Sequence, residues 1–346
     1  MKQLLSAARQ KLPFFNGTLP AALERNQGSM TAKWRRIENL SSATTALGEF
    51  SGTAAAFLGR SAVQPSVTDV TKEIKKYGNL VLTTEELDLF NVNSRNVQLM
   101  ETLGANAGLS LNLIAQTEFD LASLVRYCTG VAGGGANDSA VTSAVLASDI
   151  KWAVNKLNAN SAMLFTPQTG GSQNVGTVPV RQSYYGICHV DVEEDIRAVT
   201  GFIPVEQYGG YAETMPFEFG AVGGVRWCST EIIPVTSNVT GATTSTGSQV
   251  LRGLGVNGGY DVYSSYVYGQ EAVGSLGLGN MFATTSSEMY DPKNPPGVLP
   301  IYHAPGSSGI FDPYNEMASL AWKAWAAFKI LNSNWIVKIR SGASKL

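Results

Sequence analysis

A long, one-sided apolar stripe is the sequence feature that most constrains the fold. Between about Asn91 and Cys128, apolar residues recur at steps of three, four or seven, at Met100, Leu103, Ala107, Leu111, Ile114, Leu121 and Val125. Polar side chains lie off this stripe, as in a helix with one buried face. The spacing predicts a single helix of roughly 30 residues, on the order of 45 Å long. Gly104 and Gly108 inside it predict either a bend or close packing against a neighbour.

The sequence before this helix has too few large apolar residues for a core of its own. Residues 1–45 are predicted to form an N-terminal arm, whose Leu4, Leu5, Ala8 and Leu12 have helical spacing. We expect this short amphipathic piece to dock on a partner subunit rather than on a membrane. Residues 46–82 predict a long hairpin, with two extended stretches around a small-residue tip near Gly59 to Pro65. Such a hairpin must project or pack on something else.

Helices and strands alternate after the glycine-rich break at residues 131–137. We expect a helix with Ser148 as its N-cap, running to about Asn158. A short helix is expected around Glu193 to Val199, and Thr236 to Ser248 is expected to be a surface loop. The predicted strands are Tyr184–His189, Val222–Cys228, Tyr260–Tyr268 and two long ones near the C-terminus, around 320–330 and 335–340. This alternation with long insertions is typical of the α+β class.

Charge is scarce along the chain and unevenly placed. Charged residues make up 15% of the 346 residues, against roughly 25% in typical soluble domains. Residues 1–45 carry a net charge of +5, residues 46–316 carry −12 and residues 317–346 carry +5. Basic ends around an acidic body predict arms that lie on acidic surfaces of neighbouring copies, which we favour. The other interpretation is non-specific contact with the phosphates of packed DNA.

Targeting signals are missing from the sequence. Cys128, Cys188 and Cys228 are odd in number and widely spaced, which is typical of a reducing compartment. The N-terminus lacks the apolar run of a signal peptide, and no run of 18 apolar residues occurs. We therefore expect synthesis in a cytoplasm and no contact with a membrane.

Few residues suggest a catalytic, metal-binding or cofactor-binding site. His189 and His303 lie far apart in the sequence, and we expect both to be structural. The acidic residues Asp191, Glu193, Glu194 and Asp195 lie where they would complement the dipole of a short helix. Residues 253–258 fit GxGxxG but lack the preceding strand and following helix of a dinucleotide site. We predict no catalytic, cofactor-binding or metal-binding residues, and hence a structural protein rather than an enzyme.

Several short motifs follow one another in a fixed order between about residues 31 and 341. They are Tyr77-Gly78-Asn79, Ser148-Asp149-Ile150-Lys151, Leu157-Asn158-Ala159-Asn160, His189-Val190-Asp191, Gly223-Gly224-Val225-Arg226, Pro305-Gly306-Ser307-Ser308-Gly309, Asp312-Pro313-Tyr314-Asn315, Ala321-Trp322-Lys323-Ala324-Trp325 and Lys329-Ile330-Leu331-Asn332. In this order the motifs resemble the major capsid proteins of N4-like tailed phages, which adopt the Hong Kong 97-type capsid fold. His189-Val190-Asp191 departs from the family's usual His-Pro-Asp.

The resemblance implies how the chain is divided and what it does. It implies an N-terminal arm (1–45), an extended two-stranded loop (46–80), a peripheral domain with the long backbone helix (81–136), an axial domain (137–285) and a return segment with the closing strands of the peripheral domain (286–346). The chain would assemble into hexamers and pentamers of an icosahedral head that encloses double-stranded DNA. It would act in the virion, after assembly in the cytoplasm of a bacterial host.

The resemblance also implies partners. These are further copies of the chain, a portal protein, packaged double-stranded DNA held by non-specific contact and, as a further candidate, a decoration protein. Only about 45 residues precede the extended loop, so we expect scaffolding to come from a separate protein. No lysine lies between Lys33 and Lys72, so we expect no isopeptide cross-link from the loop tip. Two alternatives stay open: an encapsulin-type shell with enzyme cargo, and a soluble hydrolase with an unrecognised site.

Overall fold

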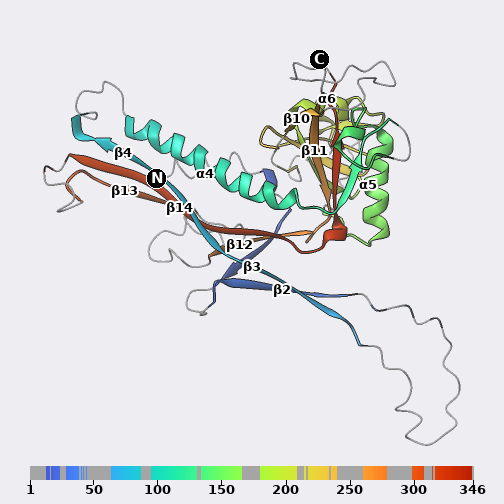
Figure 1. Ribbon diagram of the computed structural model, residues 1–346, viewed down its shortest axis with the longest axis horizontal. Coiled ribbons are helices and arrows are strands. Elements are labelled where there is room, and N and C mark those ends of the chain that lie inside the picture. The colour runs from blue at the N-terminus through green and yellow to red at the C-terminus, as the bar shows by residue number, and fades with distance from the viewer. Residues whose placement is uncertain are drawn as a thin grey trace, which may run out of the picture.

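The computed structural model in Figure 1 has an elongated region, a compact region and a projecting two-stranded ribbon. It describes residues 13–15, 17–23, 29–38, 40, 42, 44, 64–86, 95–130, 134–165, 180–208, 214–215, 217–233, 235–239, 260–278, 298–307, 314 and 316–344. The mixed α+β class expected from the sequence is confirmed, with more strand than helix among these residues.

Helix α4 (Arg95–Phe119) runs the length of the elongated region. Leu103, Ala107, Leu111 and Ala115 on its buried side are at most 3% exposed and pack on strand β14 (Met317–Ile330). Gly104 and Gly108 are also buried, which favours close packing as the reason for two glycines in one helix. The bend in this helix stays a prediction.

The predicted end of the helix was wrong. The helix stops at Phe119, Leu121 is 65% exposed, and Val125 lies in strand β5 (Leu124–Tyr127). Strand β5 pairs in parallel with β15 (Ile336–Ser341), a segment more than 200 residues away. This distant pairing satisfies the backbone of residues 124–127, and the helical spacing of their side chains does not reveal it.

A five-stranded sheet forms the second layer of the elongated region. Its strands are β1 (Leu19–Leu23), β12 (Val273–Leu278), β14, β13 (Val298–His303) and β4 (Lys75–Thr84). The long strand β14 pairs antiparallel with β4 along one edge and with β13 and then β12 along the other. The two C-terminal strands predicted from the sequence are confirmed as β14 and β15, although they belong to different sheets.

An eight-stranded sheet forms the centre of the compact region. Its strands are β5, β15, β11 (Tyr260–Tyr268), β6 (Tyr184–His189), β9 (Val225–Thr230), β8 (Glu218–Val222) and β7 (Ile203–Pro204), with β10 (Val235–Val239) beside β11. Successive residues of β6 alternate between two cores: Tyr185 and Ile187 join the core around α4, and Tyr184 and Cys188 join a second core. This two-sided burial explains the almost continuous apolar sequence of β6.

Helices α5 (Ala147–Ala159) and α6 (Val190–Arg197) contribute to that second core, which confirms both predicted helices. The N-cap prediction was wrong, because Leu146 holds that position and donates its backbone N–H to the side chain of Asp149. The single strand predicted over Val222–Cys228 was also wrong. Gly223 and Gly224 have φ values of +65° and +88° and turn the chain from β8 into β9.

The ribbon consists of β2 (Thr31–Ile37) and β3 (Val67–Glu73), paired antiparallel. The hairpin was expected within residues 46–82, but the strand that pairs with β3 lies in the segment assigned to the N-terminal arm. Residues 45–63 lie outside the described residues, as do most of the predicted loop at 236–248 and the GxGxxG match at 253–258. The domain boundaries at 80, 136 and 285 stay predictions.

Leu111→Ala tests the packing of α4. Leu111 is 1% exposed, and truncating a buried leucine should lower the free energy of unfolding by about 2–5 kcal/mol. Leu121→Ala is the matched control and should change it by less than about 0.5 kcal/mol, because Leu121 lies beyond the helix. Urea unfolding followed by circular dichroism measures both. Equal losses would contradict the observed helix end.

Candidate assembly surfaces

The ribbon has one face toward the body of the molecule and one toward solvent. Ala32, Trp34 and Arg36 point to the body, while the alternate residues Lys33, Arg35 and Ile37 are exposed. On the exposed face, Asp69 of β3 forms ion pairs with Lys33 (2.6 Å) and Arg35 (3.2 Å). Exposed pairs of this kind contribute little stability. The ribbon therefore depends on its base, or on a partner, for a fixed direction.

Glu118 is a charged residue at the base of the ribbon. It lies near the end of α4, is 5% exposed, and accepts hydrogen bonds from Lys72 Nζ of β3 (2.9 Å) and the backbone N–H of Ile330 (3.4 Å). Lys329 Nζ lies 3.1 Å from Oε1, the oxygen that also accepts from Ile330, whereas Lys72 donates to Oε2. Burial opposes ionisation of this carboxyl, but the two lysines outweigh it and hold its pKa below the ordinary value. One carboxylate thus joins the ribbon, α4 and β14.

Arg36 makes a second connection at the base of the ribbon. Its guanidinium donates to the backbone oxygen of Leu331 (3.0 Å) and, through Nε, to Glu38 Oε1 (2.7 Å). Thr68 of β3 donates to the same glutamate oxygen (3.2 Å). The contact to Leu331 ties the ribbon to the segment between β14 and β15.

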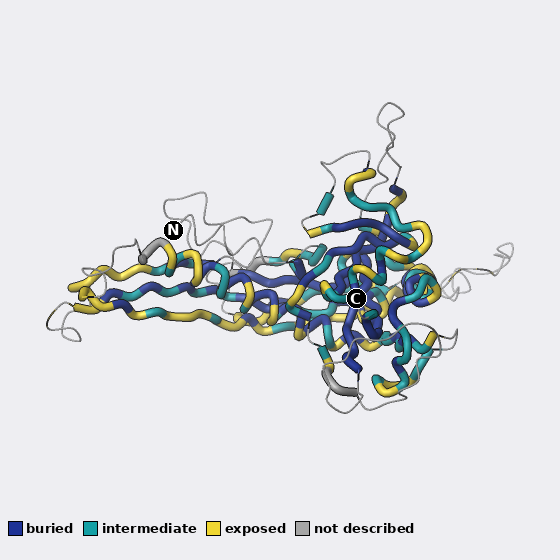
Figure 2. Tube along the Cα trace, turned by 90° about the horizontal axis from the view of Figure 1, so that it is seen from above, coloured by how far each residue is buried: buried dark blue, intermediate teal, exposed yellow. Residues whose placement is uncertain are grey.

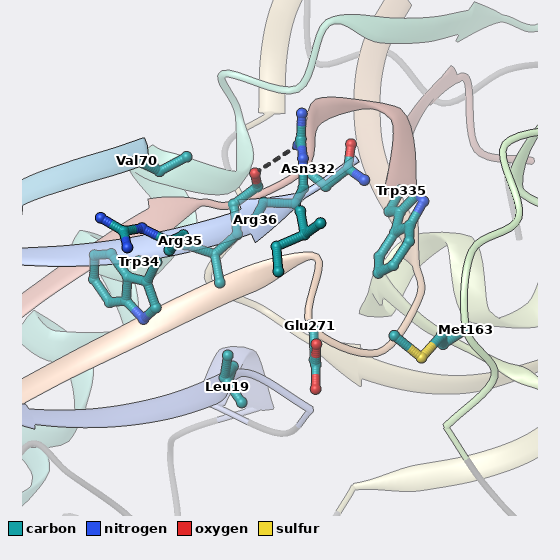
Figure 3. A pocket seen from close by; sticks show the side chains of 11 residues that line it. Leu19, Trp34, Arg35, Arg36, Val70, Met163, Glu271, Asn332 and Trp335 are labelled. Atoms are coloured by element: carbon teal, nitrogen blue, oxygen red, sulfur yellow. Dashed lines mark hydrogen bonds between the residues drawn. The ribbon is translucent and has the colours of Figure 1, made fainter. Parts of the chain in front are cut away.

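A cavity of about 360 Å³ lies beside this connection (Figure 3). Its walls are mostly apolar and come from the ribbon, from β1 and from the turns of the compact region: Leu19, Trp34, Ile37, Val70, Met163, Leu331 and Trp335, with Arg35, Arg36, Glu271 and Asn332. Trp34 Nε1 is buried and has no hydrogen-bond partner among the described residues. The cavity lies between the ribbon and the body, so its shape depends on the direction of the ribbon.

The five-stranded sheet has an open apolar face on the side away from α4. Leu80 and Leu82 of β4 are 54% and 57% exposed, and they pair with Ala321 and Ser319 of β14. Residues directly opposite each other in an antiparallel pair share a face, so Met317 of β14, 39% exposed, lies on this face too. Residues 318, 320, 322, 324 and 326 of β14 point the other way and are buried in the same chain. We call this side the open sheet face.

Both histidines lie at the ends of strands, and the acidic run lies in α6. Nδ1 of His189 accepts the backbone N–H of Asp191 (3.1 Å) and caps α6, while His303 is exposed at the end of β13. Three of the four carboxylates of the acidic run have separate partners: Asp191 accepts from Tyr263, Glu193 from Arg197 and Asp195 from the backbone of Ser344. No group of three potential metal ligands occurs among the described residues.

The three cysteines are buried, and none of them is in a disulfide bond. Burial raises the pKa of each thiol well above its ordinary value, and at Cys128 the neighbouring Asp149 adds to the effect. Such thiols are unreactive at neutral pH. Among the described helices, none is both long and apolar enough to cross a membrane.

The open sheet face and the ribbon depend on pairings that the sequence analysis did not predict. In the ribbon strand Thr31–Ile37, polar and apolar residues alternate until Arg36 interrupts the pattern, and the partner strand follows about 30 residues later. This alternation over residues 31–35 was the one local pattern from which the strand could have been predicted.

Comparison with known proteins identifies the fold. No model of a known protein family matches the chain, and no curated protein matches it significantly. The capsid of Ralstonia phage GP4 aligns with a TM-score of 0.63 at 10% identity, over 97% of this chain and 92% of that chain. The capsid of cyanophage P-SCSP1u aligns with a TM-score of 0.54 at 12% identity, over 97% and 89%. This chain has the fold of phage capsid proteins.

An encapsulin structure is also similar to this chain. The SrpI encapsulin complex from Synechococcus elongatus aligns with a TM-score of 0.50 at 10% identity, over 96% of this chain and 88% of that chain. All three solved structures match nearly the whole length of the chain. The ribbon, the open sheet face and the compact region therefore belong to one capsid-type architecture.

Glu118→Gln tests the connection at the base of the ribbon. Loss of the carboxylate should lower the free energy of unfolding at pH 7 by about 2 kcal/mol. Because the pKa of Glu118 is lower in the folded chain than its ordinary value of 4.5, the ionised carboxylate stabilises the fold fully at any pH above 4.5. This stabilisation is lost as the pH falls through the folded-state pKa. Urea unfolding at pH 7 and at about pH 3 measures the difference.

Glu86→Gln, at an exposed glutamate, is the control and should have little effect at either pH. A loss from Glu118→Gln that is the same at both pH values would contradict an ionic connection.

Proposed function

We propose that this chain is the major capsid protein of a tailed bacteriophage, of the N4-like family with the Hong Kong 97-type fold. It forms hexamers and pentamers of an icosahedral head that encloses double-stranded DNA. The observation that carries the proposal is the match of almost the entire chain to solved phage capsids. The ordered series of motifs along residues 31 to 341 supports the narrower family assignment.

In this proposal the five segments keep the roles that the resemblance implies. Residues 1–45 are the N-terminal arm, 46–80 the extended loop, 81–136 and 286–346 the peripheral domain, and 137–285 the axial domain. The pairing of Thr31–Ile37 with Val67–Glu73 extends the two-stranded loop back into the arm segment. The extended loop of one copy lies across a neighbouring copy, and the open sheet face is the surface that receives a neighbour.

The chain works with other proteins in this proposal. A separate scaffolding protein directs its assembly in the bacterial cytoplasm, a portal protein occupies one vertex, and a decoration protein is a further candidate on the finished virion. The packaged DNA meets the shell through non-specific contacts. No part of the proposed function is enzymatic, and no cofactor is involved.

Co-expression with its scaffolding protein tests the proposal. Negative-stain microscopy should show closed shells, and gel filtration without the scaffold should show capsomers or other large assemblies. A small oligomer under both conditions would contradict the proposal and would favour the soluble hydrolase.

An encapsulin-type shell is the second candidate, because the SrpI encapsulin complex shares the fold. The contents of the particles separate the two candidates. Double-stranded DNA inside particles isolated from their natural source supports the phage head. An enzyme cargo without DNA would favour the encapsulin-type shell.

Leu80→Glu with Leu82→Glu tests the open sheet face. Burial of a leucine at a contact contributes about 1.5–3 kcal/mol, and the loss is multiplied because every copy makes the same contact. We expect a folded chain that forms no shells by negative-stain microscopy. Leu121→Glu, at a leucine that is 65% exposed and lies outside this face, is the control. Normal shells from the double variant would exclude this face as an interface.

A denaturing gel tests for covalent cross-links. The loop tip has no lysine between Lys33 and Lys72, so boiled shells should run as a single band of 36.8 kDa under reducing conditions. A ladder of oligomers in such a gel would show a cross-link from another position. Shells of a relative known to cross-link provide the positive control.

A further inference from the structure

Helix α4 carries a second apolar stripe, on the side away from its own core. Leu109 and Leu113 are 38% and 43% exposed and lie one turn apart. The hydroxyls that border them are turned back to the helix: Ser110 donates to the backbone oxygen of Asn106 (2.8 Å) and Thr117 to that of Leu113 (2.8 Å). Because these hydroxyls bond to the helix backbone, they present few hydrogen-bonding groups to the outside.

This stripe also lacks charge. No charged residue occurs from Thr102 to Thr117, although an exposed helix face normally carries charged side chains. We call the surface formed by Thr102, Leu109, Leu113 and Thr117 the outer stripe of α4. An uncharged leucine stripe of this length on a helix predicts that another segment covers it.

The N-terminal end of the described chain is anchored beside the outer stripe. Phe14 is fully buried, its backbone N–H donates to Asn112 Oδ1 of α4 (3.2 Å), and its ring meets Phe119 edge to face at 5.1 Å. Asn112 is three residues from Leu109, so the two side chains are neighbours on the helix surface. The described chain therefore begins within about one helical turn of the exposed leucines, and residues 1–12 lie outside the described residues.

The sequence of residues 1–12 fits that surface. Leu4, Leu5, Ala8 and Leu12 give one apolar side, and the segment has no acidic residue. A helix of 12 residues is about 18 Å long, and the outer stripe from Thr102 to Leu113 is about 16 Å long. An isolated helix of this length is marginal in water, so it needs a surface to form on.

We propose that residues 1–12 form an amphipathic helix on the outer stripe of α4 in the same chain. The anchor at Phe14 favours the same chain over the partner subunit expected from the sequence, because a short tether gives a local concentration in the millimolar range. The docked segment covers Leu109 and Leu113 and brings the cations Lys2, Arg9 and Lys11 to a helix face that has none. The surface thus changes from apolar to basic.

Thiol labelling of the unassembled subunit tests this docking. Leu113→Cys introduces an exposed thiol into a chain whose own cysteines are buried and unreactive. Removal of residues 1–12 should raise the labelling rate of this thiol several-fold. Leu82→Cys, on the open sheet face, is the matched control and should label at the same rate with and without residues 1–12. An unchanged rate at residue 113 would overturn the proposal.

A disulfide test distinguishes the same chain from a neighbouring one and does not require the truncated chain to fold. With Phe14 at Asn112 and the docked helix running toward Thr102, residue 8 lies opposite residue 109. Ala8→Cys combined with Leu109→Cys should therefore oxidise to a product that has lost both new thiols and runs as a monomer on a non-reducing denaturing gel. A dimer band would overturn docking within one chain, because the segment would then cover α4 of a second copy. Failure to form any disulfide would overturn the proposal altogether. The tests use unassembled subunits, so they are independent of shell formation.

Discussion

The packing of α4 along β14 is the contact on which the rest of the structure depends. Alternate residues of β14 face the buried stripe of the helix, and Trp322 donates through Nε1 to Asn106 Oδ1 of α4 (3.0 Å). Asn79 of β4 donates to the same oxygen (3.2 Å), so one amide oxygen fixes the helix against two strands. The elongated region consists of two layers held in register by this contact, and the ribbon, the compact region and the N-terminal anchor all attach to it.

Two layers are too few to enclose both sides of a sheet. In the elongated shape of the described chain, buried residues gather in the compact region and continue along the middle of the elongated region (Figure 2). A shape of this kind is costly for a monomer and suited to a subunit whose neighbours cover its exposed strands.

The sequence predicted those elements whose signal is local. The spacing of Leu103, Ala107 and Leu111 predicted α4, and the continuous apolar run over Tyr184–His189 predicted β6. Elements defined by a distant partner were mispredicted. Residues 124–127 continue the helical spacing but pair with β15, and Thr31–Ile37 pairs across a 29-residue connection. The connection at Glu118 was not predictable either, because its three partners come from β3 and from the end of β14.

Part of the chain's small number of charges lies inside the structure. Arg126 Nε and Asp149 form a buried pair (2.9 Å), and the buried Arg340 pairs through Nη2 with the half-buried Asp138 (2.6 Å). Buried pairs fix orientation more than they add stability, and these two connect β5 with α5 and β15 with the turn before α5. Charges paired in this way do not add to the charge of the surface. The open sheet face and the outer stripe of α4 are left with leucines, so contacts there depend on apolar burial and shape, and salt affects them less than it affects ion pairs.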